Sequence, residues 1–206
     1  MLLVAATAAS GIIAALYPDT QVRGWSIGTA YSAFFLLLWA LFLGPLKVLM
    51  DRANPVHSAV RRDVGIAAGT MAAVHTVIGL QVHMGGSMSR YFIPPAIPKL
   101  SDNIFVAANW IGLFSVSVLM SLVVISNNRS LRGLGLSTWK LLQRGAYPAA
   151  ILALVHGIAY QLLERRSPPL IAILICASSV VVIVQIAGLR TKRRRSDIDA
   201  TEVENR

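Results

Sequence analysis

The chain has 206 residues, of which 55% are hydrophobic and only 14% carry a charge, and its mean hydropathy is +0.64. A soluble domain of this length carries more charge and interrupts its apolar stretches sooner, so the composition excludes an ordinary soluble protein and indicates an integral membrane protein. The net charge of +10 therefore does not indicate nucleic acid. The expected partner of this charge is membrane lipid with anionic headgroups.

Six apolar stretches follow one another along the chain, and most approach the ~20 residues that cross a bilayer. Because a backbone in lipid must satisfy its own hydrogen bonds, the fold is predicted to be an all-α bundle of about six transmembrane helices. The first stretch is short enough to be a signal sequence, but no basic segment precedes its apolar residues, and we interpret it as a helix. The stretches lie near residues 2–17, 26–48, 63–83, 104–126, 143–163 and 168–189.

The Lys and Arg residues predict the orientation. If both termini face the cytoplasm, 14 of the 19 basic residues lie on inner segments, which is the positive-inside pattern of membrane proteins. Residues 1–189 are then a single transmembrane domain, and residues 190–206 are a cytoplasmic tail, first basic and then acidic, that is predicted to be disordered. The five remaining basic residues, on outer segments, are Arg23, Arg90, Lys99, Arg165 and Arg166.

Motifs for soluble redox chemistry are missing from the sequence. It contains no GxGxxG, no Walker loop and no CxxC, so any nucleotide or flavin chemistry is expected from another polypeptide. The one cysteine, Cys176, lies in an apolar stretch and is interpreted as a small buried hydrophobe.

Two of the four histidines, His75 and His156, lie deep within apolar stretches. An ionisable residue at such depth is a functional hypothesis by default, and the alternative is a neutral histidine hydrogen-bonded between helices. His75 follows Arg61 by 14 residues and His156 follows Gln143 by 13, which corresponds to ~21 Å and ~20 Å of helix. Both helices run outward, so the two rings are predicted at one level in the outer half of the membrane. By contrast, His57 is interpreted as a solvated loop residue, and His83 as an interfacial one.

Two neutral imidazoles that face each other across a helix bundle are the ligand set of a six-coordinate haem iron. Zinc usually requires four ligands, including thiolates or carboxylates, and the sequence offers none nearby. We therefore predict a haem, with His75 and His156 as its metal ligands.

The stretch RRDVG…AAVH at 61–75, together with NRSLRGLGLSTWKLLQRGAYPAAILALVH at 128–156, resembles the ferric reductase-like transmembrane domain family. The likeness covers about residues 40–165 and is closest to the haem-binding membrane subunits of the bacterial methionine sulfoxide reductase system. It implies a bacterial inner-membrane electron-transfer subunit that carries b-type haem between its helices and works with redox partner proteins. Electrons would pass from a cytoplasmic flavin reductase or a quinol to an acceptor outside. It also implies that Arg61 lies near an inner haem or flavin site and meets a propionate or phosphate, the alternative being positive-inside anchoring.

The chain departs from the family pattern at Gln143, where the family has a histidine, and glutamine is a poor iron ligand. A second haem is therefore not expected, and a flavin or quinone near Arg61 and Gln143 remains open. Pro148 is predicted to interrupt the helix that carries His156, because proline cannot donate to the carbonyl of Arg144. Two alternative functions also stand. One is a haem- or pigment-binding accessory subunit of a photosynthetic or respiratory complex, and the other is a cofactor-free scaffold or transporter.

Overall fold

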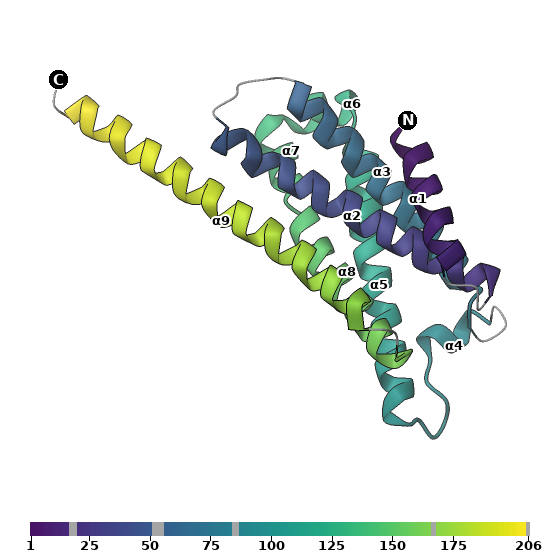
Figure 1. Cartoon of the computed structure of the whole chain (residues 1–206). Coiled ribbons are helices and arrows are strands. Elements are labelled where there is room, and N and C mark those ends of the chain that lie inside the picture. Colours follow the sequence, from purple (N-terminus) through teal and green to yellow (C-terminus); the bar gives the residue numbers. More distant parts are fainter. Residues whose placement is uncertain (17–19, 51–55, 84–86, 166–167, 205–206) are drawn as a thin grey trace.

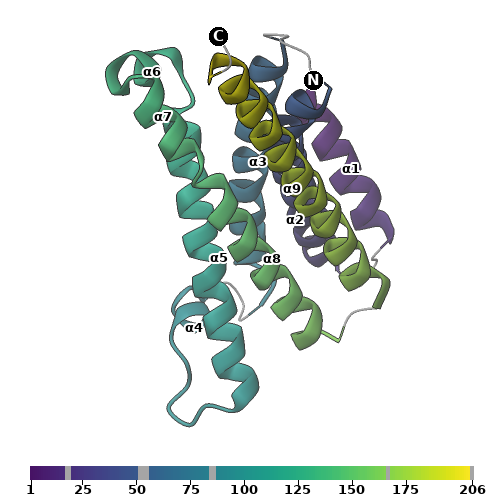
Figure 2. The ribbon, with the colours of Figure 1, turned by 90° about the vertical axis from the view of Figure 1, so that its left-hand side faces the viewer.

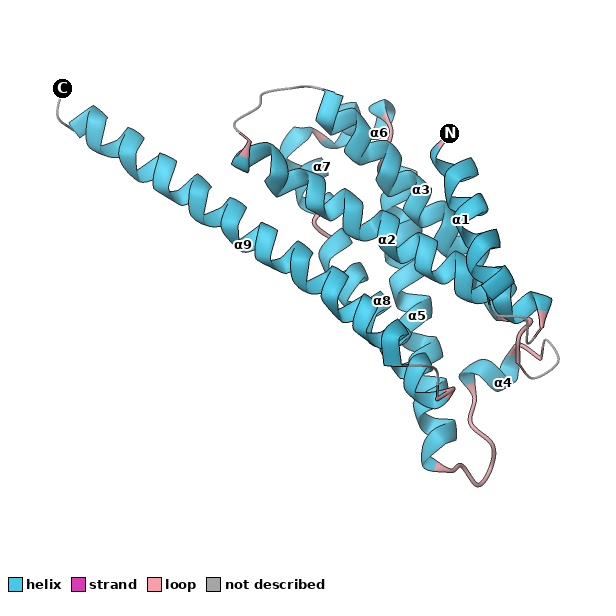
Figure 3. Ribbon diagram, viewed as in Figure 1, coloured by secondary structure: helices cyan, strands magenta, loops and turns pink. Residues whose placement is uncertain are grey.

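The computed structural model of the chain describes residues 1–16, 20–50, 56–83, 87–165 and 168–204, without the side chains of residues 56–58, 168 and 196–204. In these ranges all regular structure is helical and no strand is present (Figure 3). The predicted all-α class is therefore confirmed.

Among the described residues, six helices overlap the six predicted stretches, and three short helices lie between them. The six are α1 (Leu2–Leu16), α2 (Gln21–Leu49), α3 (Val56–Gly79), α5 (Leu100–Ile125), α8 (Ala146–Leu163) and α9 (Pro168–Glu204). The short helices are α4 (Ser89–Phe92), α6 (Asn128–Leu134) and α7 (Leu136–Gln143).

Four of the described segments are long and apolar enough to cross a membrane. They are Gln21–Leu49, Leu100–Ile125, Leu136–Leu163 and Pro169–Arg195. Helix α1 is apolar but has only 15 residues. The four segments support the expectation of a membrane protein that contacts lipid.

The long helices run alternately up and down the bundle (Figures 1 and 2). Both termini, α6 and α7 lie at one end in the two views, which we call the terminal end. The opposite end carries α4, and we call it the α4 end. The last part of α9 extends away from the other helices (Figure 1).

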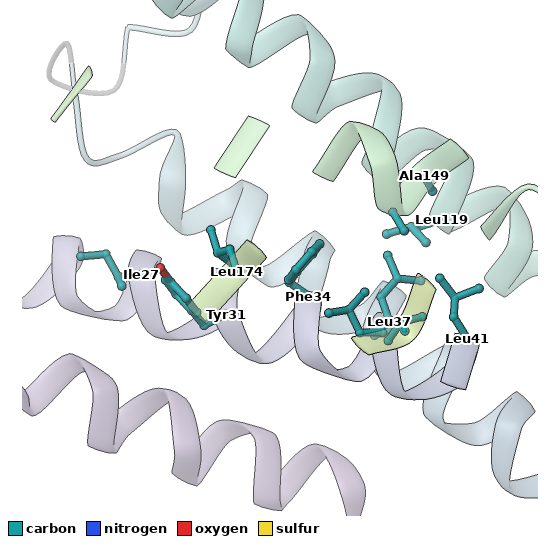
Figure 4. Packing of buried hydrophobic residues seen from close by; sticks show 12 residues of the cluster. Ile27, Tyr31, Phe34, Leu37, Leu41, Leu119, Ala149 and Leu174 are labelled. Carbon is teal, nitrogen blue, oxygen red and sulfur yellow. The ribbon is translucent and has the colours of Figure 1, made fainter. Parts of the chain in front are cut away.

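Helix α2 forms the centre of the main core (Figure 4). Those of its side chains that belong to this core recur every three or four residues, so they form one stripe along the helix. This stripe contacts Leu119 of α5, Ala149 of α8 and Leu174 of α9. The stripe consists of Ile27, Tyr31, Phe34, Leu37, Leu38 and Leu41.

Small residues let neighbouring helices approach each other closely. A Cβ on Gly28 of α2 would overlap the backbone of Ser10 in α1, and the hydroxyls of Ser10 and Ser32 are 2.9 Å apart. A Cβ on Gly69 of α3 would likewise overlap Val123 of α5. These contacts hold α1 and α5 against the pair formed by α2 and α3.

The predicted interruption near Pro148 is present as a break between α7 and α8. Helix α7 ends at Gln143, α8 begins at Ala146, and Pro148 occupies the first turn of α8, where a missing backbone donor does no harm. The carbonyl of Arg144 accepts instead from the backbone N–H of Tyr147, at 3.0 Å.

Helix α9 extends further than the sequence analysis predicted. It continues through the basic residues 190–195 to Glu204, where a disordered tail was expected. Its apolar part supplies the helical nucleus that an isolated tail would lack, and each further residue then adds a hydrogen bond. Arg193 and Arg195 also precede Asp197 and Asp199 by four residues, a spacing that favours helix.

Candidate functional site

The structure brings His75 of α3 and His156 of α8 together. Their ring centroids are 6.2 Å apart, and the ring planes are nearly perpendicular, at 74°. Both side chains are half-buried in the interior of the bundle. The two helices run in the same direction from the terminal end, so similar distances along each bring the two rings to one level.

Each ring is anchored by its Nδ1 atom to the backbone of another helix. His75 Nδ1 lies 3.0 Å from the carbonyl oxygen of Ser26 in α2, and His156 Nδ1 lies 2.7 Å from that of Ala108 in α5. A carbonyl only accepts hydrogen bonds, so a neutral imidazole in either place carries its proton on Nδ1. The lone pair of each ring is then on Nε2, which is the arrangement that second-shell contacts give to metal-binding histidines.

A glycine leaves room for the ring of His156. A Cβ on Gly112 of α5 would lie 2.7 Å from both Cε1 and Nδ1 of His156, closer than real Cβ contacts. Gly112 lies one helical turn after Ala108, so the same stretch of α5 receives the ring and accepts its hydrogen bond. On the other side, Gly79 of α3 approaches the ring of His75, where a Cβ would lie 3.7 Å from Cε1.

Both histidines line a cavity of about 290 Å³ between α2, α3, α5 and α8. This volume is close to the ~300 Å³ at which typical ligand pockets begin. Toward the middle of the bundle its walls are apolar, with Phe34, Leu37 and Leu119. Toward the α4 end the lining also includes polar residues, which are His83, Tyr91, Asn109, Tyr160 and Gln161.

An ion-pair network lies at the α4 end. Glu164, whose side chain is 9% exposed, lies 2.6 Å from a guanidinium nitrogen of Arg23 and 2.7 Å from Nε2 of His83. This network joins the beginning of α2, the segment that follows α3 and the end of α8. His83 thus pairs with a carboxylate, and it lines the cavity instead of lying only at the membrane interface.

Two tyrosines close the α4 end of the cavity. The Tyr91 hydroxyl accepts from the backbone N–H of His83 at 2.8 Å and lies 2.7 Å from the carbonyl oxygen of the same residue. Burial raises the pKa of Tyr91, so its phenol stays protonated and donates to that carbonyl. Tyr160 donates to Oδ1 of Asn109 at 2.7 Å, and its ring centroid lies 4.9 Å from that of His156.

The other residues predicted to bind a cofactor lie elsewhere. Gln143, at the end of α7, donates to the Ser126 hydroxyl at 3.1 Å, and Arg61 packs against Gly44 of α2. Neither lines the cavity with the histidine pair. Residue 57 belongs to the first turn of α3 and not to a loop, but the side chain of His57 lies outside the described ones.

Several residues of this site were missed in the sequence. The Ser26 and Ala108 carbonyls are backbone groups, which leave no side-chain signal, and Gly112 resembles any other glycine of an apolar helix. Glu164 did carry a signal, as an acidic residue next to an apolar stretch. In comparisons with protein-family models and with curated proteins, none of them matches this chain.

Proposed function

We propose that this protein binds one b-type haem between His75 and His156 and carries electrons across a membrane. The observation that carries the proposal is the geometry of the two rings. A metal held about 2 Å from a nitrogen of each of two imidazoles requires ring centroids roughly 6 Å apart. The centroids of His75 and His156 are 6.2 Å apart.

The donor set of the site fits an iron porphyrin. Among the described residues, no group of three His, Cys, Asp or Glu side chains is placed to hold a metal ion. Two imidazoles are too few for a typical protein-only zinc site, whereas they complete the coordination of an iron that a porphyrin already holds. The cavity next to the rings has apolar walls and several small residues, among them Ala72, Ala153 and Gly157.

The residues of the chain have three tasks in this proposal. His75 and His156 hold the iron, and the Ser26 and Ala108 carbonyls fix the tautomer and the direction of the two rings. The apolar cavity walls keep water from the rings. When bound, haem supplies reversible one-electron chemistry, which the side chains of the chain do not.

The wider setting is part of the same proposal. The six long helices all cross the membrane, both termini are cytoplasmic, and the protein resides in a bacterial inner membrane. The motifs at 61–75 and 128–156, which resemble the ferric reductase-like family, support a donor on the cytoplasmic side, either a flavin reductase or a quinol. A second protein would accept electrons at the α4 end.

The test uses protein purified from haem-replete cells. A pyridine haemochrome assay should give one haem per chain, and a reduced-minus-oxidised spectrum should show low-spin iron with two nitrogen ligands. His75→Ala and His156→Ala should each abolish or severely weaken this spectrum. His57→Ala is the matched control, because residue 57 precedes His75 in α3 by 18 residues, or ~27 Å of helix.

Two results would contradict the proposal. Full haem retention in both the His75 and His156 variants would contradict the assignment of these two histidines as iron ligands. A colourless pure protein would favour the cofactor-free scaffold, in which the two rings pack against each other as neutral, hydrogen-bonded histidines. Co-purification with a photosynthetic or respiratory complex, without electron flow in isolation, would favour an accessory subunit.

A further inference from the structure

The segment between α4 and α5 carries apolar side chains that the bundle does not cover. We call residues 93–100 the apolar loop. Its Ile93, Ile97 and Leu100 are 65%, 91% and 76% exposed. A cluster of exposed apolar side chains with polar residues around it is typical of an interaction site.

Both ends of the apolar loop are fixed to the bundle. Tyr91, just before it, is buried, and the indole Nε1 of Trp110 in α5 donates to the Phe92 carbonyl at 3.1 Å. At the other end, a carboxylate oxygen of Asp102 accepts from the backbone N–H of Lys99 at 2.8 Å. The anchored ends hold the exposed side chains in place, which lowers the entropic cost of binding a partner.

In the proposed membrane arrangement, the apolar loop lies outside the lipid. The apolar part of α5 begins at Ile104, because the polar residues 101–103 precede it. From Ile104 back to Leu100 the helix rises ~6 Å, and the headgroup layer on one side of a bilayer is about 5–7 Å thick. The rest of the apolar loop extends beyond the beginning of α5, at the tip of the α4 end (Figures 1 and 2). Its exposed isoleucines therefore face water, and a protein is the partner that can cover them.

The exposed charges around the apolar loop are basic. Arg90 of α4, Lys99 at the beginning of α5 and Arg165 after α8 are exposed. Among the described residues of the α4 end, the acidic ones are Asp102, which accepts from a backbone N–H, and Glu164, which is buried in the ion-pair network. A second copy of the chain would present the same positive charge and would be repelled. A protein with carboxylates around an apolar groove would be attracted.

The same three cations run against the positive-inside pattern. In the proposed orientation they lie on the outer side, where Lys and Arg are disfavoured. Anchoring in the membrane therefore does not explain them, whereas attraction of an acidic partner does.

We propose that the apolar loop, together with Arg90, Lys99 and Arg165, forms the docking surface for an acidic soluble protein. The partner presents an apolar groove rimmed by Asp and Glu side chains. The inference rests on the proposed function for the side of the membrane and for the need of an acceptor at the α4 end. It adds the residues that this acceptor contacts and the charge that it carries.

The experiment uses cytochrome c as the probe, in its native form and with its lysines succinylated. Lysines surround the apolar haem edge of cytochrome c, and succinylation turns them into carboxylates, so the two forms differ in charge around one apolar surface. Full-length protein with Ala96→Cys and Cys176→Ser, in phosphatidylcholine nanodiscs, carries a fluorescent label in the apolar loop, which the cytochrome quenches when it docks. At low ionic strength the succinylated form should bind about tenfold more tightly or better, and salt at about 0.5 M should reduce this preference.

Two double variants separate the charge from the apolar contact. Arg90→Glu with Lys99→Glu should abolish or invert the preference, because the face loses its positive charge. Ile93→Ser with Ile97→Ser should weaken binding of the succinylated form about tenfold and leave its salt dependence unchanged.

Arg132→Glu with Lys140→Glu is the matched control. Both residues are exposed, and they belong to the short helices α6 and α7 at the terminal end. The net charge of the chain changes equally, but the α4 end does not change, so this variant should keep the wild-type preference. An equal loss of preference in the control would contradict a docking surface at the α4 end.

The remaining outcomes distinguish the other partners. Equal affinity for the two cytochromes, or tighter binding of the native form, would rule out an acidic partner. Quenching of the label by spin-labelled headgroups, with protection from iodide in the water, would show that lipid covers the apolar loop and would overturn the inference. Failure of the proposed function is separate, because the label reports docking even when this chain holds no haem. Tight docking without electron transfer to the succinylated cytochrome would contradict the proposed function and support the docking surface.

Discussion

Gly112→Ala tests whether the position of His156 is set by the lack of a side chain on α5. The new Cβ would lie 2.7 Å from Cε1 and Nδ1 of His156, whereas ordinary contacts between such atoms are ~3.5–4.0 Å. The ring must therefore move away from α5 by about 1 Å. Such a shift stretches its 2.7 Å hydrogen bond to the Ala108 carbonyl to the limit of an effective one.

The energetic effect follows from these two changes. Overpacking costs about 1–3 kcal/mol, and the loss of one hydrogen bond costs about 0.5–1.5 kcal/mol. Together they should weaken haem binding by about 2 kcal/mol or more, which is more than tenfold in the dissociation constant. Titration of the haem-free protein, followed by the Soret band, measures this change. The low-spin spectrum should also turn into a mixture that contains high-spin iron.

Gly157→Ala is the control for this prediction. Gly157 follows His156 directly and also lines the cavity, but a Cβ there would lie 3.5 Å from Cδ1 of Leu174, an ordinary contact. Both variants gain the higher helix propensity of alanine, about 1 kcal/mol at most, so the difference between them isolates the contact with His156. Unchanged haem affinity and spectrum in Gly112→Ala would refute the geometry of the pair.

Two further predictions follow from the α4 end and from the missing nucleotide motifs. Glu164→Gln removes the carboxylate shared by Arg23 and His83, so the free energy of unfolding, measured by thermal unfolding, should fall by about 1–3 kcal/mol. Asp63→Asn is the control: it breaks the exposed ion pair with Arg62 and should leave the free energy of unfolding almost unchanged. An unchanged melting temperature in Glu164→Gln would mean that the network adds no stability. The pure protein should not be reduced by NADH or NADPH until a flavin reductase or a quinol is added, and reduction by NADH alone would show that the chain binds the nucleotide itself.

The sequence was sufficient to predict that His75 and His156 lie at the same level of the bundle. The depth of each ring depends only on the constant rise per residue of a helix. In two helices that run in the same direction, equal numbers of residues from the start therefore place two side chains at the same level of the bundle. The angular position of the His156 ring was harder to predict. It depends on the break between α7 and α8 near Pro148 and on the space left by Gly112, which are properties of packing.

The polar half of the site could not be predicted from local sequence. Tyr31 and Gln161 form a hydrogen bond across 130 residues, and Arg23 and Glu164 form an ion pair across 141. Each of these residues, taken alone, resembles an ordinary polar residue near the end of an apolar stretch. Only the packing of α2 against α8 decides that they share the α4 end with the cavity.

In the proposed function, the position of the histidine pair also limits how electrons could enter. His75 lies ~21 Å of helix beyond Arg61, and His156 lies ~20 Å of helical rise beyond Gln143, so a haem between the two rings is close to the α4 end and far from the terminal end. Gln143 donates to Ser126 and Arg61 packs against Gly44, so neither extends the cavity toward the terminal end. A donor that docks at the terminal end therefore needs a second carrier, such as a flavin or a quinone, that binds between the helices. An acceptor at the α4 end needs none, because Tyr160 and His83 already connect the His156 ring to that surface.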